Sequence, residues 1–428
     1  MKKIDVVIIP YNDFLKGERF GFRARDQHLF LEIAKDERVN KVIIVERPRS
    51  IVSFLLLSKL GVCSGKKLNK NMRRVGEKFF LFEFFTLGLE QVKLKHLWFD
   101  KIYGSLQFVE KFRDALRQIE LGDFIALSFN PFANKFVDMI KPKFFVFDVM
   151  DNFCFHPEFV AFKNYICSSF EWVSSNSDLI FCVNEELKNF FLKNYPLSAE
   201  KIFVLPNGVD EKLIASGFVP DDIRKIKRPR IGYVGVISDR IDFELVEYVA
   251  RERKFYNFIF IGGKYGDVAR QIKRLRNFEN IYFLGDKHYS KVADYIFSLD
   301  VCMVPHKVNE FTLSNDPMKI YEYLYFGKPV VSTKIGIQDE IKDHIFIADD
   351  KGEFLLLLDR AVSLAGDAMF VNLQSKAVKP SMFWSGRATY STSSKSLPLQ
   401  KIVIRNYDDI NLFHLLKISI YKPKLLPQ

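Results

Sequence analysis

The stretch from residue 294 to residue 333, DYIFSLDVCMVPHKVNEFTLSNDPMKIYEYLYFGKPVVST, decides the fold. It contains an apolar strand at 301–305, a polar loop, a helix opened by Pro317 and ended by Gly327, and a second strand at 330–333. Proline suits the first turn of a helix, and glycine suits the residue beyond its end. The pattern therefore predicts one helix between two strands, with a polar loop at its N-terminus.

The start of this helix has the chemistry of a phosphate site. Free N–H groups and the positive end of the helix dipole can hold an anion there. Lys319 stands beside them for a second contact, and Glu322 lies one turn further on, where it can accept hydrogen bonds from sugar hydroxyls. These residues outline a site for a nucleotide diphosphate.

Strand and helix patterns alternate along the rest of the chain. After a strand at 4–9, a polar loop with Gly17 and Gly21 and a helix at 26–35 are expected, and the alternation begins again after Pro229. Further strands are expected at 42–45, 124–128, 144–147, 179–183, 230–235 and 258–261, with a helix at 242–253. Two such series predict two doubly wound sheets, whose ligands bind beyond the carboxyl ends of the strands.

The motifs resemble those of a known enzyme family. The run P-x-K-x-x-E-Y-x-x-x-G-K-P-V-V, from Pro317 to Val331, resembles the donor-nucleotide motif of the retaining GT-B glycosyltransferases of group 1, or family 4. KIFVLPNGVD at 201–210 resembles that family's interdomain signature, and IYFLG at 281–285 resembles a short strand of its donor domain. Together these motifs cover residues 200–365.

The resemblance implies an α/β GT-B architecture of two facing Rossmann-like, doubly wound domains with a cleft between them. An acceptor-side domain is expected at 1–205, a connector that can act as a hinge at 206–229, and a nucleotide-sugar-binding domain at 230–365. Residues 366–428 read as an atypical tail, because the segment around 390–396 is a poor helix former.

The same resemblance assigns the donor site to Gly235, Arg240, Lys319 and Glu322, with Arg240 on the diphosphate and Glu322 on the ribose. A solvated surface arginine and an exposed helix glutamate are the alternatives. Many members of the family carry the pattern E-x7-E. Glu322 corresponds to its second glutamate, and Ser314 stands at the position of the first. We expect Ser314 and Asn315 to contact the donor sugar through hydroxyl and amide groups; the alternative is impaired sugar transfer.

The acceptor side is expected at the end of the strand 144–147. Asp148, Asp151 and His156 follow it, and Asp151 is the candidate for acting on the acceptor, with a helix or turn cap as the alternative. Arg25 and His28 resemble the family's pattern for its first helix. Gly17 and Gly21 either let a loop approach the reacting centre or are plain turn glycines.

Composition narrows the class of protein. The 428 residues carry no D-x-D pattern, so no metal is expected, and no cofactor beyond the nucleotide-sugar donor. Five cysteines form no C-x-x-C pair, which favours a reduced, cytoplasmic protein. The sequence contains no run that approaches eighteen apolar residues, so no transmembrane helix is expected. The net charge is +12, but the basic residues do not form a nucleic-acid-binding motif in which they alternate with aromatic residues. Nucleic acid is therefore not an expected partner.

The resulting hypothesis is a retaining hexosyltransferase that builds a cell-surface polysaccharide or a lipid-linked glycan. A nucleotide-sugar epimerase of the same architecture and an inactive glycosyltransferase-like scaffold are the alternatives. The epimerase is less favoured, because the loop around Ser314 is poor in carboxylates and histidines. An NAD-dependent dehydrogenase is disfavoured, because GGKYG at 262–266 is not the G-x-G-x-x-G turn.

A basic segment suggests where the enzyme works. Residues 59–78 carry seven Lys or Arg and one Glu, directly after the apolar run 51–57. This combination predicts a peripheral contact with an anionic inner membrane leaflet. An ordinary segment with a solvated basic face is the alternative.

Overall fold

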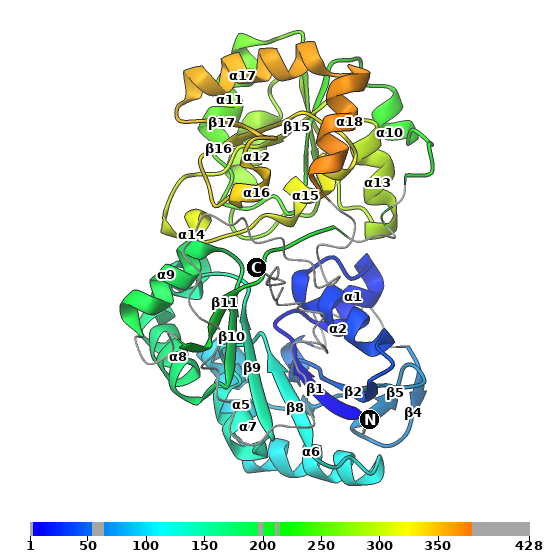
Figure 1. Ribbon diagram of the computed structural model, residues 1–428, viewed down its shortest axis with the longest axis vertical. Helices are drawn as coiled ribbons and strands as arrows, with labels where there is room; N and C mark the ends of the chain where they lie inside the picture. Colours follow the sequence, from blue (N-terminus) through cyan, green and yellow to red (C-terminus); the bar gives the residue numbers. More distant parts are fainter. Residues whose placement is uncertain (1–2, 54–63, 196–199, 210–212, 214, 379–428) are drawn as a thin grey trace, which may run out of the picture.

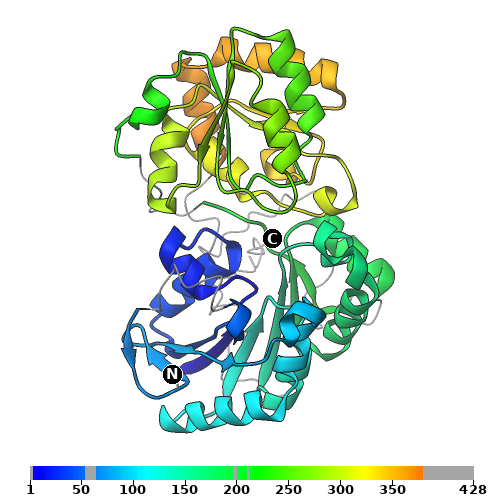
Figure 2. The ribbon, with the colours of Figure 1, turned by 180° about the vertical axis from the view of Figure 1, so that it is seen from behind.

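The computed structural model describes residues 3–53, 64–195, 200–209, 213 and 215–378. They form two α/β domains stacked along the long axis of the molecule (Figure 1). Seen from behind, helices again cover the sheet of each domain (Figure 2). The expectation of two facing doubly wound sheets is confirmed.

The first sheet has the strand order β11-β10-β9-β8-β1-β2-β6-β5-β4. All its pairs are parallel except those of β5, which joins β4 and β6 in antiparallel fashion. The strands are β1 (Ile4–Ile9), β2 (Val39–Val45), β4 (Lys66–Lys67), β5 (Met72–Arg74), β6 (Phe79–Phe82), β8 (Phe124–Ser128), β9 (Phe144–Val149), β10 (Leu179–Cys182) and β11 (Ile202–Val204). The short pair β3 (Arg49–Ser50) and β7 (Phe85–Thr86) lies outside this sheet.

Helices bury both faces of the first sheet, which explains its continuous apolar strands. Val6 and Ile8 of β1 pack under α1 and α2, whereas Val7 and Ile9 pack under α5 to α9. The helices are α1 (Phe14–Phe20), α2 (Arg25–Lys35), α4 (Glu90–Leu94), α5 (Leu97–Tyr103), α6 (Leu106–Gln118), α7 (Asn134–Ile140), α8 (Lys163–Asn176) and α9 (Glu185–Asn194), with short 3-10 turns at η2 (Phe153–Phe155) and η3 (Pro157–Phe162).

The second sheet is wholly parallel and has the order β14-β13-β12-β15-β16-β17, which is the 3-2-1-4-5-6 arrangement of dinucleotide-binding folds. Its strands are β12 (Arg230–Val234), β13 (Asn257–Ile261), β14 (Ile281–Gly285), β15 (Val301–Val304), β16 (Val330–Thr333) and β17 (Phe346–Ala348). Its helices are α10 (Asp221–Arg224), α11 (Phe243–Glu252), α12 (Ala269–Leu275), α13 (Tyr289–Phe297), α14 (Glu310–Leu313), α15 (Met318–Tyr325), α16 (Asp339–Lys342), α17 (Lys351–Leu364) and α18 (Ala368–Ala377).

The stretch 294–333 folds largely as its sequence predicts. Pro317 is the N-cap of α15, and Gly327 takes the left-handed conformation (φ 64°) just past its end, where its N–H bonds to Leu324 O at 2.8 Å. One detail differs: the polar loop contains the short helix α14, capped by the side chain of Asn309.

Two further expectations are wrong in detail. Residues 16–21, expected as a loop, mostly form α1, because Gly17 sits inside a helix that ends at Gly21 (φ 95°). The second domain also extends beyond residue 365. Helix α18 packs on α15, and Phe370 stacks on Phe346 with ring centroids 6.2 Å apart. Residues 379–428, which hold the rest of the expected tail, lie outside the described residues.

Candidate functional site

The candidate donor site lies where the strand order of the second sheet reverses, between β12 and β15. Ligands of open α/β sheets bind at this point, beyond the carboxyl ends of the strands. Helices α14 and α15 stand there, on the side of the second domain that faces the first (Figure 1). Among the described residues, the backbone N–H groups of Met318 and Lys319 donate no hydrogen bond, so they remain available to an anion.

Lys319 is held by a tyrosine of β12. Its Nζ donates to Tyr233 Oη at 2.9 Å and lies 4.3 Å from the centroid of that ring. Tyr233 Oη donates to Val236 O at 3.0 Å, so His306 Nε2, 3.2 Å away, is assigned as a donor to the same oxygen. Burial, reinforced by Lys319 and Arg240, holds the pKa of His306 well below its usual value. The positively charged Lys319 ammonium group is thus hydrogen-bonded to Tyr233, which in turn contacts the neutral, buried ring of His306.

Glycines allow this side chain to lie close to the backbone. Gly235 has φ 141°, and a Cβ there would stand 2.8 Å from Lys319 Cε. A Cβ on Gly262, at the end of β13, would stand 1.9 Å from Gly235 O. The ends of β12 and β13 therefore pack backbone against backbone, which leaves room for Lys319 above them.

Glu322 is buried, so the alternative of an exposed helix glutamate is wrong. Tyr289 of α13 donates from Oη to Glu322 Oε1 at 2.8 Å. The Tyr289 ring also meets the His28 ring of the first domain, with centroids 5.3 Å apart. A Cβ on Gly21 would stand 2.7 Å from Tyr289 Cβ. The turn at Gly21 thus approaches the second domain through Tyr289, and His28 lies at the same interface.

Arg240 lies beside the junction of the two domains. Its guanidinium carbon is 5.5 Å from the Phe311 ring centroid, and its carbonyl oxygen accepts from Lys307 N at 2.8 Å. No hydrogen bond or ion pair of its guanidinium is found among the described residues. The group is therefore free to bind a ligand anion, and it acts through its charge on Asp151, His156 and His306.

The structure brings Asp151, Ser314 and Asn315 together across the domain boundary. With its amide nitrogen directed at Asp151, Asn315 donates to Asp151 Oδ1 at 3.0 Å and to Phe311 O at 2.7 Å. Ser314 Oγ donates to Glu310 O at 2.7 Å and accepts from Asn152 Nδ2 at 3.4 Å. The Ser314 hydroxyl hydrogen is thus directed at a backbone carbonyl.

Burial sets the charge state of this junction. It raises the pKa of Asp151 to about 6, while the Arg240 guanidinium opposes the rise. Burial lowers the pKa of His156 to about 3, and Arg240 adds to the effect. Near neutral pH, Asp151 is therefore mostly a carboxylate and His156 is uncharged.

Arg25 and Asp148, two other candidates from the sequence, bind each other. Arg25 Nε and Nη2 donate to the two Asp148 oxygens at 2.9 and 2.8 Å, and Arg25 also donates to Leu205 O, Pro206 O and Asn207 Oδ1. This buried pair fixes the start of the connector.

The connector is fixed on the donor side as well. Asn207 N donates to Asp316 Oδ2 at 2.6 Å, and Tyr321 Oη donates to Asp316 Oδ1 at 2.9 Å. Burial raises the pKa of Asp316 to about 6. Asp316 therefore joins the connector to α15, only three residues from Lys319.

Sequence reasoning missed several residues of this site. Tyr233, His306, Tyr289 and Asp316 position the expected donor residues or the connector. The sequence could have indicated His306 as a site residue, because it follows Pro305 directly after the end of a buried strand, where ligands of such sheets bind. Tyr289 has no comparable signal in its local sequence.

No group of three His, Cys, Asp or Glu side chains among the described residues is arranged to hold a metal ion. No helix in the described part of the chain combines the length and apolar character of a membrane span.

Comparisons with known proteins bear on the second domain and on the fold. Residues 228–363 match the profile of the family described as glycosyl transferases group 1. The putative teichuronic acid biosynthesis glycosyltransferase TuaH of Bacillus subtilis is 24% identical over 212 residues, which are 47% of this chain and 53% of that protein. The chain thus matches about half the length of this relative.

Solved structures show the fold. Sucrose-phosphate synthase from Thermosynechococcus elongatus superposes with a TM-score of 0.60 at 13% identity, over 88% of this chain and 95% of that one. Anabaena HepE in complex with UDP superposes with a TM-score of 0.57 at 14% identity, over 88% and 94%. HepE in complex with UDP-glucose superposes with a TM-score of 0.57 at 14% identity, over 87% of this chain and 93% of that one. The fold of this protein is GT-B.

Proposed function

We propose that this chain, with its GT-B fold and a second domain that matches the group 1 glycosyltransferases, transfers a sugar from a nucleotide-diphosphate donor to a glycan or lipid-linked acceptor. One observation carries the proposal. At the switch point of the second sheet, Lys319 is held over Gly235, and Glu322 lies on the same helix as Lys319. The guanidinium of Arg240 makes no hydrogen bond or ion pair among the described residues.

The donor's diphosphate binds the N-terminus of α15 together with Lys319 and Arg240, and Glu322 accepts from the ribose hydroxyls. The hydrogen bond from Tyr289 Oη to Glu322 Oε1 holds this side chain in position. HepE crystallised with UDP and with UDP-glucose, which supports the same ligand class and makes UDP the natural probe. No cofactor beyond the donor is needed.

The transfer retains the donor's anomeric configuration, and the departing phosphate accepts the acceptor's proton on the same face. Lys319, Arg240 and the α15 N-terminus stabilise the phosphate charge, so the reaction runs without a metal. Asp151 stands on the acceptor side of this centre, and Asn315, which donates to Asp151 Oδ1, stands on the side of the donor sugar. Ser314 positions the loop, because its hydroxyl bonds Glu310 O and Asn152.

The protein works in the cytoplasm, at the inner face of the membrane, on a cell-envelope glycan. The name of TuaH supports the acceptor class. On the hairpin β4–β5, Lys66 and Lys67 are exposed beside Leu68, which is 42% exposed. Arg73 is less available, since it pairs with Glu83. Residues 54–63, which hold part of the apolar run and of the basic cluster, lie outside the described residues.

The test is titration of UDP, followed by an assay of UDP-glucose hydrolysis and transfer. Wild-type protein should bind UDP and release it from UDP-glucose, and Lys319→Ala should do both poorly. Lys273→Ala, which removes an exposed charge from α12, is the matched control. Binding without any turnover of several nucleotide sugars would favour the inactive scaffold. Interconversion of the donor sugar would favour the epimerase.

A further inference from the structure

Arg47 lies two residues past the end of β2, in the first domain. Its guanidinium carbon stands 4.4 Å from the Phe99 ring centroid and 5.4 Å from that of Tyr11, which follows β1. Two aromatic rings from different elements therefore hold this cation. The ends of β1 and β2 form the ligand-binding edge of the first sheet.

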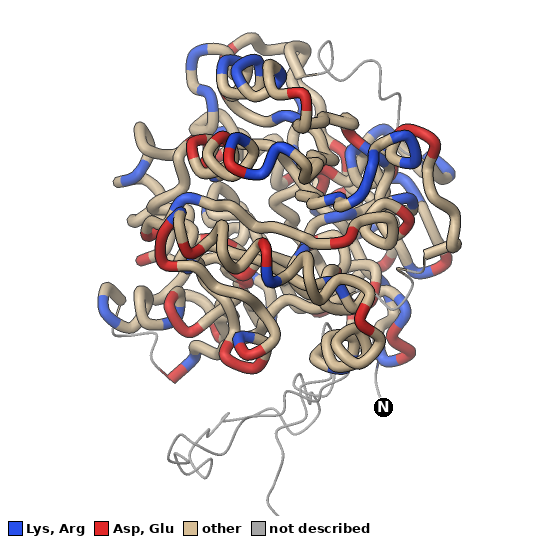
Figure 3. Tube along the Cα trace, turned by 90° about the horizontal axis from the view of Figure 1, so that it is seen from above, with Lys and Arg blue, Asp and Glu red and all other residues tan. Residues whose placement is uncertain are grey.

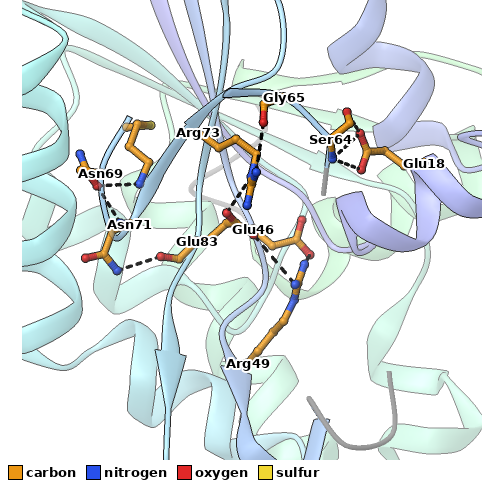
Figure 4. Close-up of polar contacts among 10 residues, drawn as sticks. Glu18, Glu46, Arg49, Ser64, Gly65, Asn69, Asn71, Arg73 and Glu83 are labelled. Carbon is orange, nitrogen blue, oxygen red and sulfur yellow. Dashed lines mark hydrogen bonds and ion pairs between the residues drawn. The ribbon is translucent and has the colours of Figure 1, made fainter. Parts of the chain in front are cut away.

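Arg47 has no hydrogen bond or ion pair among the described residues, unlike its neighbours. Figure 4 shows Arg49 against Glu46, and Arg73 between Gly65 O and Glu83. Asp13 is the strongest charge partner of Arg47, but the two groups form no ion pair, and Asp13 Oδ2 is paired with Lys16 Nζ at 2.9 Å. The Arg47 side chain is only partly buried, so its N–H groups are available to form charge-assisted hydrogen bonds with an anion.

An apolar cavity adjoins the same aromatic ring. It has a volume of about 270 Å³, and Val52, Val92 and Phe99 line it, with Lys95 and His96 also in its wall. Phe99 thus carries a cation on its face and forms part of an apolar wall. Burial lowers the pKa of His96, so its imidazole is neutral at physiological pH. A ligand that fits both features has an anionic group directly attached to an apolar chain.

This position faces the donor domain. Tyr265, on the loop after β13, donates across the domain boundary to Glu158 Oε2 at 2.6 Å. The charge of Arg47 acts to lower the pKa of both Tyr265 and Tyr11, against the larger effect of burial. An anion on Arg47 would therefore lie on the wall of the interdomain junction, where an acceptor must present its reacting end.

We propose that Arg47, Phe99 and the adjoining cavity form an acceptor subsite for an amphiphilic anion, a phosphate or diphosphate carried by an apolar chain. Arg47 binds the phosphate through its fork of N–H groups, and the first carbons of the chain enter the cavity beside Val52 and Val92. The inference rests on the proposed function, because it identifies the acceptor as a lipid phosphate that bears the growing glycan.

The test is calorimetric titration of farnesyl diphosphate with UDP held at saturation, so that the donor's diphosphate site is filled. The variants are Arg47→Gln, Arg47→Lys and the control Arg117→Gln, which removes an exposed arginine of α6. We expect Arg47→Gln to weaken binding about ten- to hundredfold and Arg47→Lys to weaken it less, because lysine keeps the charge but not the fork. Arg117→Gln should bind as wild type does, and all variants should keep the wild-type unfolding temperature.

Inorganic pyrophosphate identifies the source of the anion. It should bind at least about tenfold more weakly than farnesyl diphosphate, since burying only a few methylene groups contributes this much. Equal affinity of pyrophosphate and farnesyl diphosphate overturns the lipid part of the proposal. Unchanged farnesyl diphosphate affinity in Arg47→Gln overturns the subsite.

The proposed function is tested separately by UDP alone. UDP affinity should be the same in Arg47→Gln and wild type, and it should fall in Lys319→Ala. If wild-type protein fails to bind UDP, the donor assignment is wrong. The subsite is then still tested, because farnesyl diphosphate binding without UDP must weaken about ten- to hundredfold in Arg47→Gln and stay at the wild-type level in Lys319→Ala.

Discussion

Replacing Lys319 by alanine should weaken UDP binding by about one to two decades without unfolding the protein. The ammonium group has one protein partner among the described residues, Tyr233 Oη at 2.9 Å, so two of its three hydrogens remain for phosphate oxygens. Hydrogen bonds to charged groups contribute about 1.5–3 kcal/mol, and about 1.4 kcal/mol corresponds to one decade in affinity. Stability should change little, because Lys319 is only partly buried.

Tyr233→Phe separates positioning from direct contact. It removes the oxygen that holds Lys319, so it should weaken UDP binding by roughly 0.5–1.5 kcal/mol in the wild-type background. In a Lys319→Ala background the same change should have almost no effect, since there is no ammonium group left to position. Isothermal titration of the four proteins gives the coupling. The reasoning is refuted if the Lys319→Ala protein binds UDP as tightly as wild type, or if the two effects simply add.

Four further predictions follow from the site. Glu322→Gln should weaken UDP binding about tenfold or more in titration, and Tyr289→Phe should weaken it less, because it loses only a positioning contact. The pKa of Asp151 is about 6 in the fold against about 3.9 when unfolded, so its contribution to stability is full below about pH 4 and is lost as the pH rises through 6. Between pH 4.5 and 7 this loss amounts to about 2 kcal/mol, and Asp151→Asn should remove it in denaturant titrations at these two pH values. EDTA should leave the rate unchanged and NMR should show a retained anomeric configuration, whereas an inverted product contradicts the mechanism. Binding to anionic vesicles should fall at high salt and in a Lys66→Glu, Lys67→Glu, Arg73→Glu, Arg74→Glu variant, and absent binding removes the membrane contact.

The strands and the donor helix could be predicted from sequence because their signals are local. Strands buried on both faces appear as continuous apolar runs, as at Ile4–Ile9 and Arg230–Val234. Pro317 and Gly327 mark the ends of α15 directly. Local signals also misled: Gly17 suggested a loop, yet it lies inside α1, where a Cβ would stand 2.5 Å from the Phe22 ring. Gly17 therefore serves close packing.

The supporting residues of the site could not be predicted, because each contact joins distant parts of the chain. Tyr289 and Glu322 are 33 residues apart, and Tyr233 and His306 are 73 apart. Arg47 shows the same limit. It lies in the charged sequence ERPR, and its position between the rings of Phe99 and Tyr11 is seen only in the fold.

The serine at position 314 is consistent with the charges around it. Its hydroxyl donates to Glu310 O, which a carboxylate could not do, and its neighbour Asn315 donates to the buried carboxylate of Asp151. A glutamate at this place would bring a second negative charge toward Asp151, whose pKa is already raised by burial. A neutral donor in this loop lets Asp151 stay ionised near neutral pH while the two domains remain in contact. Ser314 thus keeps a second carboxylate away from Asp151 at the junction of the two domains.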